Sequence, residues 1–298
     1  MEERTAMALN HVNPWIRYIE ERIPLPTLSF LILGMVLSAS QIATGQFFWK
    51  STVIPFLSVL AFSVLLHTIQ DYKGIDKDIV VHPNRPFARG LFSGSEIERA
   101  ITLGIAALLV IAGLNGLLLG SKCGLIYGVI VLYSWFIYKE FFIGNWLKQH
   151  PLLYAATHQV VILAIAAYLI SAFAPEQIFD QATLGYGLVL LGGFFAYEIG
   201  RMSDPNAHPV LRTYLHVYGH QVCAGLIAGS MVAAAIGSFY AGVHIFLWSL
   251  QFTVIVACIG LATALSDRYR NIERVATIAL VVHCWSGAIQ ALFVTVGG

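Results

Sequence analysis

Charged residues are scarce in this 298-residue chain. They make up 11% of it, whereas about 25% is usual for a soluble globular domain. Hydrophobic residues make up 58% and the mean hydropathy is +0.74, so the composition excludes an ordinary soluble fold and predicts a membrane protein. Seventeen Lys and Arg are balanced by sixteen Asp and Glu, which leaves no basic surface for binding nucleic acid.

Cysteine is also sparse. The four cysteines lie in apolar stretches and form no CxxC pair, so we expect neither a disulfide framework nor a zinc site. The first 23 residues lack the positive start and short apolar core of a cleaved signal, and we expect the first apolar segment to remain in the mature protein. Val12, Ile16, Ile19 and Ile23 recur at helical spacing; residues 1–23 are therefore predicted to form an interfacial segment that anchors the chain at the membrane surface.

Long apolar runs fill most of the remaining sequence. A bilayer core about 30 Å thick needs roughly 20 helical residues, and such windows occur nine times. They cover residues 26–45, 51–72, 101–120, 123–142, 152–174, 182–200, 219–241, 243–265 and 275–296. The sequence thus predicts a single all-α, multi-pass integral membrane domain over residues 1–298, with nine transmembrane helices surrounded by membrane lipid.

The positive charges are distributed unequally between the two ends of these helices. With nine spans, the N-terminus and the connections after helices 2, 4, 6 and 8 share one side, which holds fifteen of the seventeen Lys and Arg. The positive-inside rule places that side in the cytoplasm and the C-terminus on the opposite side. The two longest polar connections, residues 72–99 and 201–220, are then cytoplasmic loops and candidates for a functional site.

Acidic and amide side chains mark the ends of the helices that precede both loops. If the second helix continues past its apolar part, Gln70, Gly74 and Asp78 repeat every four residues, and Asp71 lies on the same face. The sixth helix ends with Glu198, and Asp204 follows it. Oxygen ligands without a His or Cys cluster favour Mg²⁺, which is commonly bound by one or two carboxylates together with substrate phosphate oxygens.

Basic residues at the same predicted mouth could bind the phosphates: Arg85, Arg89, Lys139, Arg201 and Arg212. A magnesium-bridged diphosphate above a central apolar cavity fits an isoprenyl diphosphate, whose charged head would lie at the interface and whose tail would lie among the helices. Solvated helix caps and ordinary ion pairs are the alternative explanation for each charge taken separately.

The order of these motifs resembles the UbiA superfamily of intramembrane prenyltransferases, over nearly the whole chain. The first motif, Gln70-Asp71-x-x-Gly74-x-x-x-Asp78, is followed by a turn at 82–90 that is similar to the family's proline-arginine turn. The second motif is similar to the family's EIGRK variant, with Met202 in place of its lysine. Tyr133-Ser134 followed by Lys139 resembles the family's helix 4 end, where a lysine faces the diphosphate.

The resemblance implies a UbiA-like fold and a set of site residues. The implied metal-binding and catalytic residues are Gln70, Asp71, Asp78, Glu198 and Asp204, and the implied diphosphate-binding residues are Lys73, Arg85, Arg89, Lys139, Arg201 and Arg212. Gly74 replaces an aspartate that binds metal in ordinary members, and the remaining pattern resembles the NxxxGxxxD variant of UbiA-type terpene cyclases. Which acid completes the second metal motif is left open.

The resulting functional hypothesis is a Mg²⁺-dependent, membrane-embedded terpene synthase that cyclises farnesyl or geranylgeranyl diphosphate. The alternative is a prenyltransferase that acts on an aromatic or quinone-precursor acceptor. A third alternative is a lipid-binding or transport protein. The polar residues at mid-depth, such as Asn115, His158 and Gln159, are too few to form a transport path.

Overall fold

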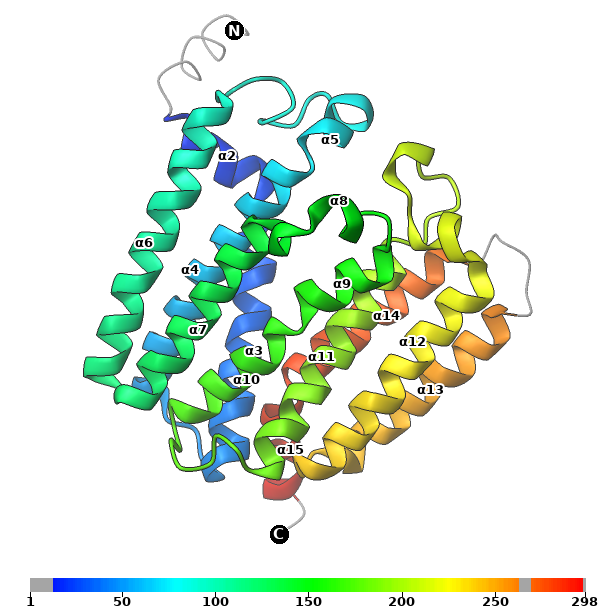
Figure 1. Ribbon diagram of the computed structural model, residues 1–298. Coiled ribbons are helices and arrows are strands. Elements are labelled where there is room, and N and C mark those ends of the chain that lie inside the picture. Colours follow the sequence, from blue (N-terminus) through cyan, green and yellow to red (C-terminus); the bar gives the residue numbers. More distant parts are fainter. Residues whose placement is uncertain (1–12, 263–268, 297–298) are drawn as a thin grey trace, which may run out of the picture.

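The computed structural model describes residues 13–262 and 269–296, and these residues form a bundle of helices without a strand (Figure 1). The predicted all-α class is therefore confirmed. The helices up to the middle of the chain are α2 (Pro14–Arg22), α3 (Leu25–Thr44), α4 (Trp49–Lys73), α5 (Ile75–Val81), α6 (Gly94–Leu118), α7 (Ser121–Tyr138), η1 (Glu140–Phe142) and α8 (Gly144–Leu147). The remaining helices are α9 (Pro151–Gln159), α10 (Val161–Ser171), α11 (Gln181–Arg201), η2 (Pro209–Leu211), α12 (Tyr214–Tyr240), α13 (His244–Ala262), α14 (Tyr269–Cys284) and α15 (Ser286–Val296).

Seven segments in the described part of the chain are long and apolar enough to cross a membrane, which supports a multi-pass membrane protein. They coincide with the first seven predicted windows, α9 and α10 together forming one span. The two C-terminal windows are not confirmed as spans. In α13 the apolar segment is described over residues 244–258. The last window is a pair of helices that meet at 67°. Nine complete spans are thus not confirmed, and residues 263–265 of the eighth window lie outside the described residues.

Close packing at the centre of the bundle depends on glycine. α11 packs against α9, α10, α12 and α14. A Cβ at Gly185 would lie 2.6 Å from the carbonyl oxygen of Gly237, and a Cβ at Gly237 would lie 2.5 Å from that of Gly185. Only hydrogen at these positions lets the backbones of α11 and α12 approach, as is common between membrane helices.

The polar segments gather at one end of the bundle. α2, α5, α8 and the yellow-green segment after α11 lie at this end, which we call the charged end, whereas α15 lies at the opposite end (Figure 1). α5 also packs against η2. The structure thus brings together the two long loops that the sequence singles out.

Candidate functional site

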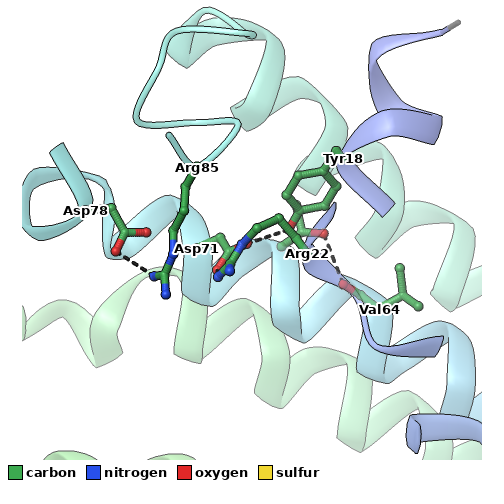
Figure 2. Close-up of polar contacts among 7 residues, drawn as sticks. Tyr18, Arg22, Val64, Asp71, Asp78 and Arg85 are labelled. Atoms are coloured by element: carbon green, nitrogen blue, oxygen red, sulfur yellow. Dashed lines mark hydrogen bonds and ion pairs between the residues drawn. The ribbon is translucent and has the colours of Figure 1, made fainter. Parts of the chain in front are cut away.

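Asp71, near the C-terminus of α4, is bound on both carboxylate oxygens (Figure 2). Arg22 donates from Nη2 to Oδ1 at 2.6 Å and from Nε to Oδ2 at 2.9 Å, and the hydroxyl of Tyr18 donates to Oδ2 at 3.1 Å. The hydrogen bond to Asp71 raises the pKa of Arg22, and burial followed by the charge of Asp71 raises the pKa of Tyr18. Arg22 therefore stays charged and Tyr18 keeps its proton, so the charge of Asp71 is already balanced by Arg22 and both of its oxygens are occupied.

The sequence analysis missed Arg22 and Tyr18, because α2 was interpreted only as an anchor. The two residues are four apart on one helix face, and that spacing was a signal that could have been used. Tyr18 is 1% exposed and stacks on Phe87 with 4.7 Å between ring centroids. α2 thus packs on the first long loop as well as contributing Arg22. Val12 of the predicted anchor lies outside the described residues.

Asp78 and Arg85, both predicted site residues, form an ion pair. Arg85 Nη1 donates to Asp78 Oδ1 at 2.7 Å, and the Asp78 residue is 8% exposed (Figure 2). α4 ends at Lys73 and α5 begins at Ile75, but Gly74 N still donates to Gln70 O and Asp78 N to Gly74 O, each at 3.0 Å. The predicted four-residue repeat therefore persists through the junction. The side chain of Gln70 is exposed.

Arg89 lies farther from the carboxylates of α4 and α5. It donates to both oxygens of Glu21 in α2, at 2.8 and 2.9 Å. The hydrogen bonds from Arg89 lower the pKa of Glu21. The structure thus shows Arg89 joining the first long loop to α2, while its role in binding a diphosphate stays a prediction.

The second acidic helix end is more open. Arg201 Nη2 donates to Glu198 Oε2 at 2.8 Å, three residues apart on α11. Asp204 is exposed, and its Oδ1 accepts a hydrogen bond at 2.9 Å from the backbone N–H of Asn206, which is a turn-forming contact. Asp204 is thus placed as a loop residue, and Glu198 is the carboxylate that belongs to the helix end.

Cations from both loops meet at the charged end without an acidic partner. Lys77 belongs to α5, and Arg212 follows η2 with a φ of 47°. Lys77 is exposed at the surface, and partial burial of its ammonium group, followed by the charges of Arg212 and Lys148, lowers its pKa. In the part of the chain that the structure describes, neither Lys77 nor Arg212 forms an ion pair. Their mutual repulsion favours a bound anion. Lys77 was missed because it occupies a position inside the first motif that the motif leaves unspecified.

Lys73, unlike these two cations, has partners of its own among the helices. Its side chain is 8% exposed, and Nζ donates to Ile137 O at 3.1 Å and to His158 Nε2 at 3.0 Å. Glu140 Oε1 lies 3.7 Å from Nζ, and the ring of Tyr154 lies 4.8 Å from it. The structure thus places Lys73 between α7, η1 and α9, and the sequence analysis missed its partners Glu140 and His158.

Glu140 holds a strained turn. Glu140, Phe141 and Phe142 have φ values of 49°, 54° and 60°, a left-handed conformation that costs about 1–2 kcal/mol per residue. Glu140 offsets part of this cost by pairing with Lys73 and, at 3.0 Å, with Lys148. Lys139, directly before the turn, lies over the ring of Tyr138 at 4.4 Å.

The donor set fits a hard cation only in part. Asp71 has both oxygens engaged, whereas Asp78 and Glu198 each use one oxygen for an arginine. Among residues 13–262 and 269–296, no group of three or more His, Cys, Asp or Glu side chains is arranged to hold a metal by itself. Two separate carboxylates do suit Mg²⁺ that completes its shell with water and phosphate oxygens.

Comparisons of the chain with protein-family models, with curated proteins and with solved structures found no match.

Proposed function

We propose that this protein is a UbiA-type intramembrane terpene synthase, which ionises a linear isoprenyl diphosphate and cyclises the resulting cation. The observation that carries the proposal is the contact between α5 and η2. It brings the segment with Lys77 close to the segment with Arg212, and neither side chain has a carboxylate partner among residues 13–262 and 269–296. A diphosphate would neutralise these positive charges, and the apolar helices would accommodate a hydrocarbon tail.

The carboxylates and cations have distinct proposed roles. Asp78 and Glu198 would hold Mg²⁺ through their remaining oxygens, with Gln70 and Asp204 as additional oxygen ligands. Arg85, Arg201, Arg212 and Lys77 would bind the diphosphate. Bound Mg²⁺ would supply charge neutralisation on the departing diphosphate. Asp71 would act indirectly, because its bonds to Arg22 and Tyr18 fix α2 against α4.

Aromatic side chains support cyclisation after ionisation. The rings of Tyr133 and Phe141 are 5.5 Å apart, Phe141 lies 6.0 Å from the His158 ring, and His158 stacks on Tyr154 at 4.1 Å. A ring face stabilises a nearby cation by about 0.5–2 kcal/mol. In a cyclase the chain's own double bonds attack the allylic cation, whereas in the alternative reaction an aromatic or quinone-precursor acceptor does so.

We further propose the orientation and span number that the sequence predicts. The charged end, with α2, would face the cytoplasm, and the C-terminus would lie on the opposite side, because the positive charges concentrate at the charged end. α13 and the bent pair α14–α15 would complete the nine spans of a UbiA-like arrangement.

The decisive experiment is an incubation of the protein in lipid nanodiscs with Mg²⁺ and farnesyl or geranylgeranyl diphosphate, without an acceptor. Gas chromatography with mass spectrometry would identify a cyclic hydrocarbon or alcohol, and released diphosphate would be measured separately. We expect product to be lost with EDTA, in Asp78→Ala and in Glu198→Ala. Lys122→Gln is the control, since it removes an exposed cation at the other end of the bundle.

Each outcome of this incubation decides between the proposals. Retained turnover in both carboxylate variants would remove the metal-site proposal. Intact diphosphate with wild-type protein, followed by turnover once an aromatic acceptor is added, would identify a prenyltransferase. Intact diphosphate with every acceptor would reject an isoprenyl diphosphate enzyme.

A further inference from the structure

A side chain of α3 interrupts the last membrane helix. The Ser38 hydroxyl donates to Cys284 O at 2.9 Å and accepts from Gly287 N at 3.1 Å and from Ala288 N at 3.3 Å. In an unbroken helix Ala288 N–H would donate to Cys284 O. Insertion of a side chain into the helical hydrogen bonds is a known cause of kinks, and it accounts for the 67° bend between α14 and α15.

Beside this break, Gln251 of α13 presents an unpaired oxygen. His283 Nδ1 contacts the carbonyl oxygen of Ala279, so Nδ1 carries the hydrogen and Nε2 accepts. Gln251 Nε2 lies 3.1 Å from His283 Nε2 and must be the donor. The amide orientation is thereby fixed, and Gln251 Oε1 is left without a partner among the described residues. Gln251 is 1% exposed.

Two more unpaired oxygens lie on α15. Ser286 is 0% exposed, and its Oγ and the Oε1 of Gln290 have no hydrogen-bond partner within the described parts of the chain. The two residues are four apart and share a helix face. α13 packs against this helix, with 6.0 Å between the ring centroids of Phe246 and Phe293. Gln251 of α13 contacts His283, which precedes Ser286 by three residues in the chain, and Gln251 therefore belongs to the same interface.

The unpaired atoms define the chemistry of the missing partner. Two amide oxygens can only accept, and the Ser286 hydroxyl can accept or donate. The indole N–H of Trp285, which lies between the two helices and also has no partner among the described residues, can only donate. A complementary ligand therefore both donates and accepts hydrogen bonds, as a hydroxyl does. Residues 244–258 and 275–293 contain no Asp, Glu, Lys or Arg. A charged ligand would therefore be buried without a counter-charge, and a neutral ligand is favoured.

We propose that the break between α14 and α15 binds the hydroxyl group of a neutral molecule next to Gln251, Ser286 and Gln290. Water can donate to both amide oxygens and accept from Ser286, whereas a membrane-soluble alcohol donates to one amide oxygen and accepts from Ser286. This site goes beyond the proposed diphosphate chemistry. α15 lies at the end of the bundle away from α2 and α5 (Figure 1), so the two sites can be tested separately. Bound water or an equivalent hydroxyl is how buried polar groups of this kind are usually satisfied.

The sign of a stability change tests the proposal. If the Ser286 hydroxyl holds a ligand, Ser286→Ala lowers the midpoint of thermal unfolding in nanodiscs, because the ligand loses a partner. If the hydroxyl is unpaired, its removal relieves a desolvation penalty and leaves the midpoint unchanged or higher, which would overturn the proposal. Gln290→Met is the second variant, with the same expectation. Ser171→Ala is the matched control, because Ser171 is also 0% exposed and its hydroxyl bonds Tyr168 O within its own helix at 2.7 Å.

Two further measurements identify the source of the hydroxyl. An alcohol site would be identified if farnesol raises the midpoint of thermal unfolding of the wild-type protein but not that of Ser286→Ala. Farnesene, which lacks the hydroxyl, should then have no effect. Hydroxyl-radical labelling of residues around the break, without an effect of farnesol, would identify bound water. Absence of both the farnesol effect and the labelling would overturn the proposal. None of these readouts requires turnover of a diphosphate.

Discussion

The ion pair between Arg22 and Asp71 gives a quantitative test of how α2 is held. The side chains are 20% and 12% exposed, so the pair is mostly buried. Breaking a fully buried pair by removing one partner costs about 3–5 kcal/mol. In Arg22→Met the Asp71 carboxylate keeps the hydrogen bond from Tyr18 and some exposure to water, and we expect a loss of about 2–3 kcal/mol in the docking of α2.

Limited chymotrypsin cleavage at Tyr18 would measure this loss, since Tyr18 is buried in the native state. When opening is fast relative to cleavage, the cleavage rate follows the population of the open state. A loss of about 2–3 kcal/mol therefore corresponds to cleavage that is about 30- to 140-fold faster, at roughly 1.4 kcal/mol per tenfold change.

Two further variants separate the pair from its surroundings. Arg22→Met combined with Asp71→Leu should recover most of the protection, because no unpaired charge is then buried. Arg17→Gln is the control on the same helix. Its pair with Glu21 has side chains 39% and 32% exposed, and such pairs contribute about 0–1 kcal/mol. An acceleration below about threefold in Arg22→Met would refute the reasoning.

Three other predictions concern the charged end and its supporting turn. Because the pKa of folded Lys77 lies below 10.5, the unfolded chain binds more protons at alkaline pH. Stability should then rise as the pH increases toward 10.5. Pyrophosphate and Lys77→Met should each reduce this rise, and an unchanged pH profile in that variant would contradict the assignment. A Cβ at Gly144 would collide with the Glu140 carboxylate, so Gly144→Ala should lower the free energy of unfolding, measured by chemical denaturation, by about 1–3 kcal/mol. Gly113→Ala is the control and should change it little, because the space around Gly113 is open. Equal effects of the two substitutions would argue against the Glu140 turn. Gly74 has φ −89° and ψ −3°, a conformation that any residue adopts, so the backbone should tolerate Gly74→Asp. The added carboxylate should lower the Mg²⁺ concentration for half-maximal turnover by about tenfold. An unaltered Mg²⁺ requirement would show that position 74 does not face the metal.

The sequence by itself determined the class of the protein and most of its helices. The windows 26–45 and 182–200 match Leu25–Thr44 and Gln181–Arg201 to within one residue, because the length and hydropathy of a membrane helix are local properties of the chain. Helix parity also placed both polar loops at one end of the bundle, and the spacing of Asp78 and Arg85 within one loop anticipated a shared site. These features depend on segments that are continuous or close in sequence.

Only the tertiary structure decided which partner each charged or polar residue has. Asp71 is bound by Arg22, 49 residues away; Lys73 contacts His158, 85 residues away; and Ser38 interrupts a helix 246 residues further along the chain. No hydropathy window or motif carries such information, because these contacts depend on how closely packed helices are rotated and displaced against one another. Burial in an apolar bundle then makes each contact strong, since an unpaired charge or hydroxyl has no water to replace the missing partner.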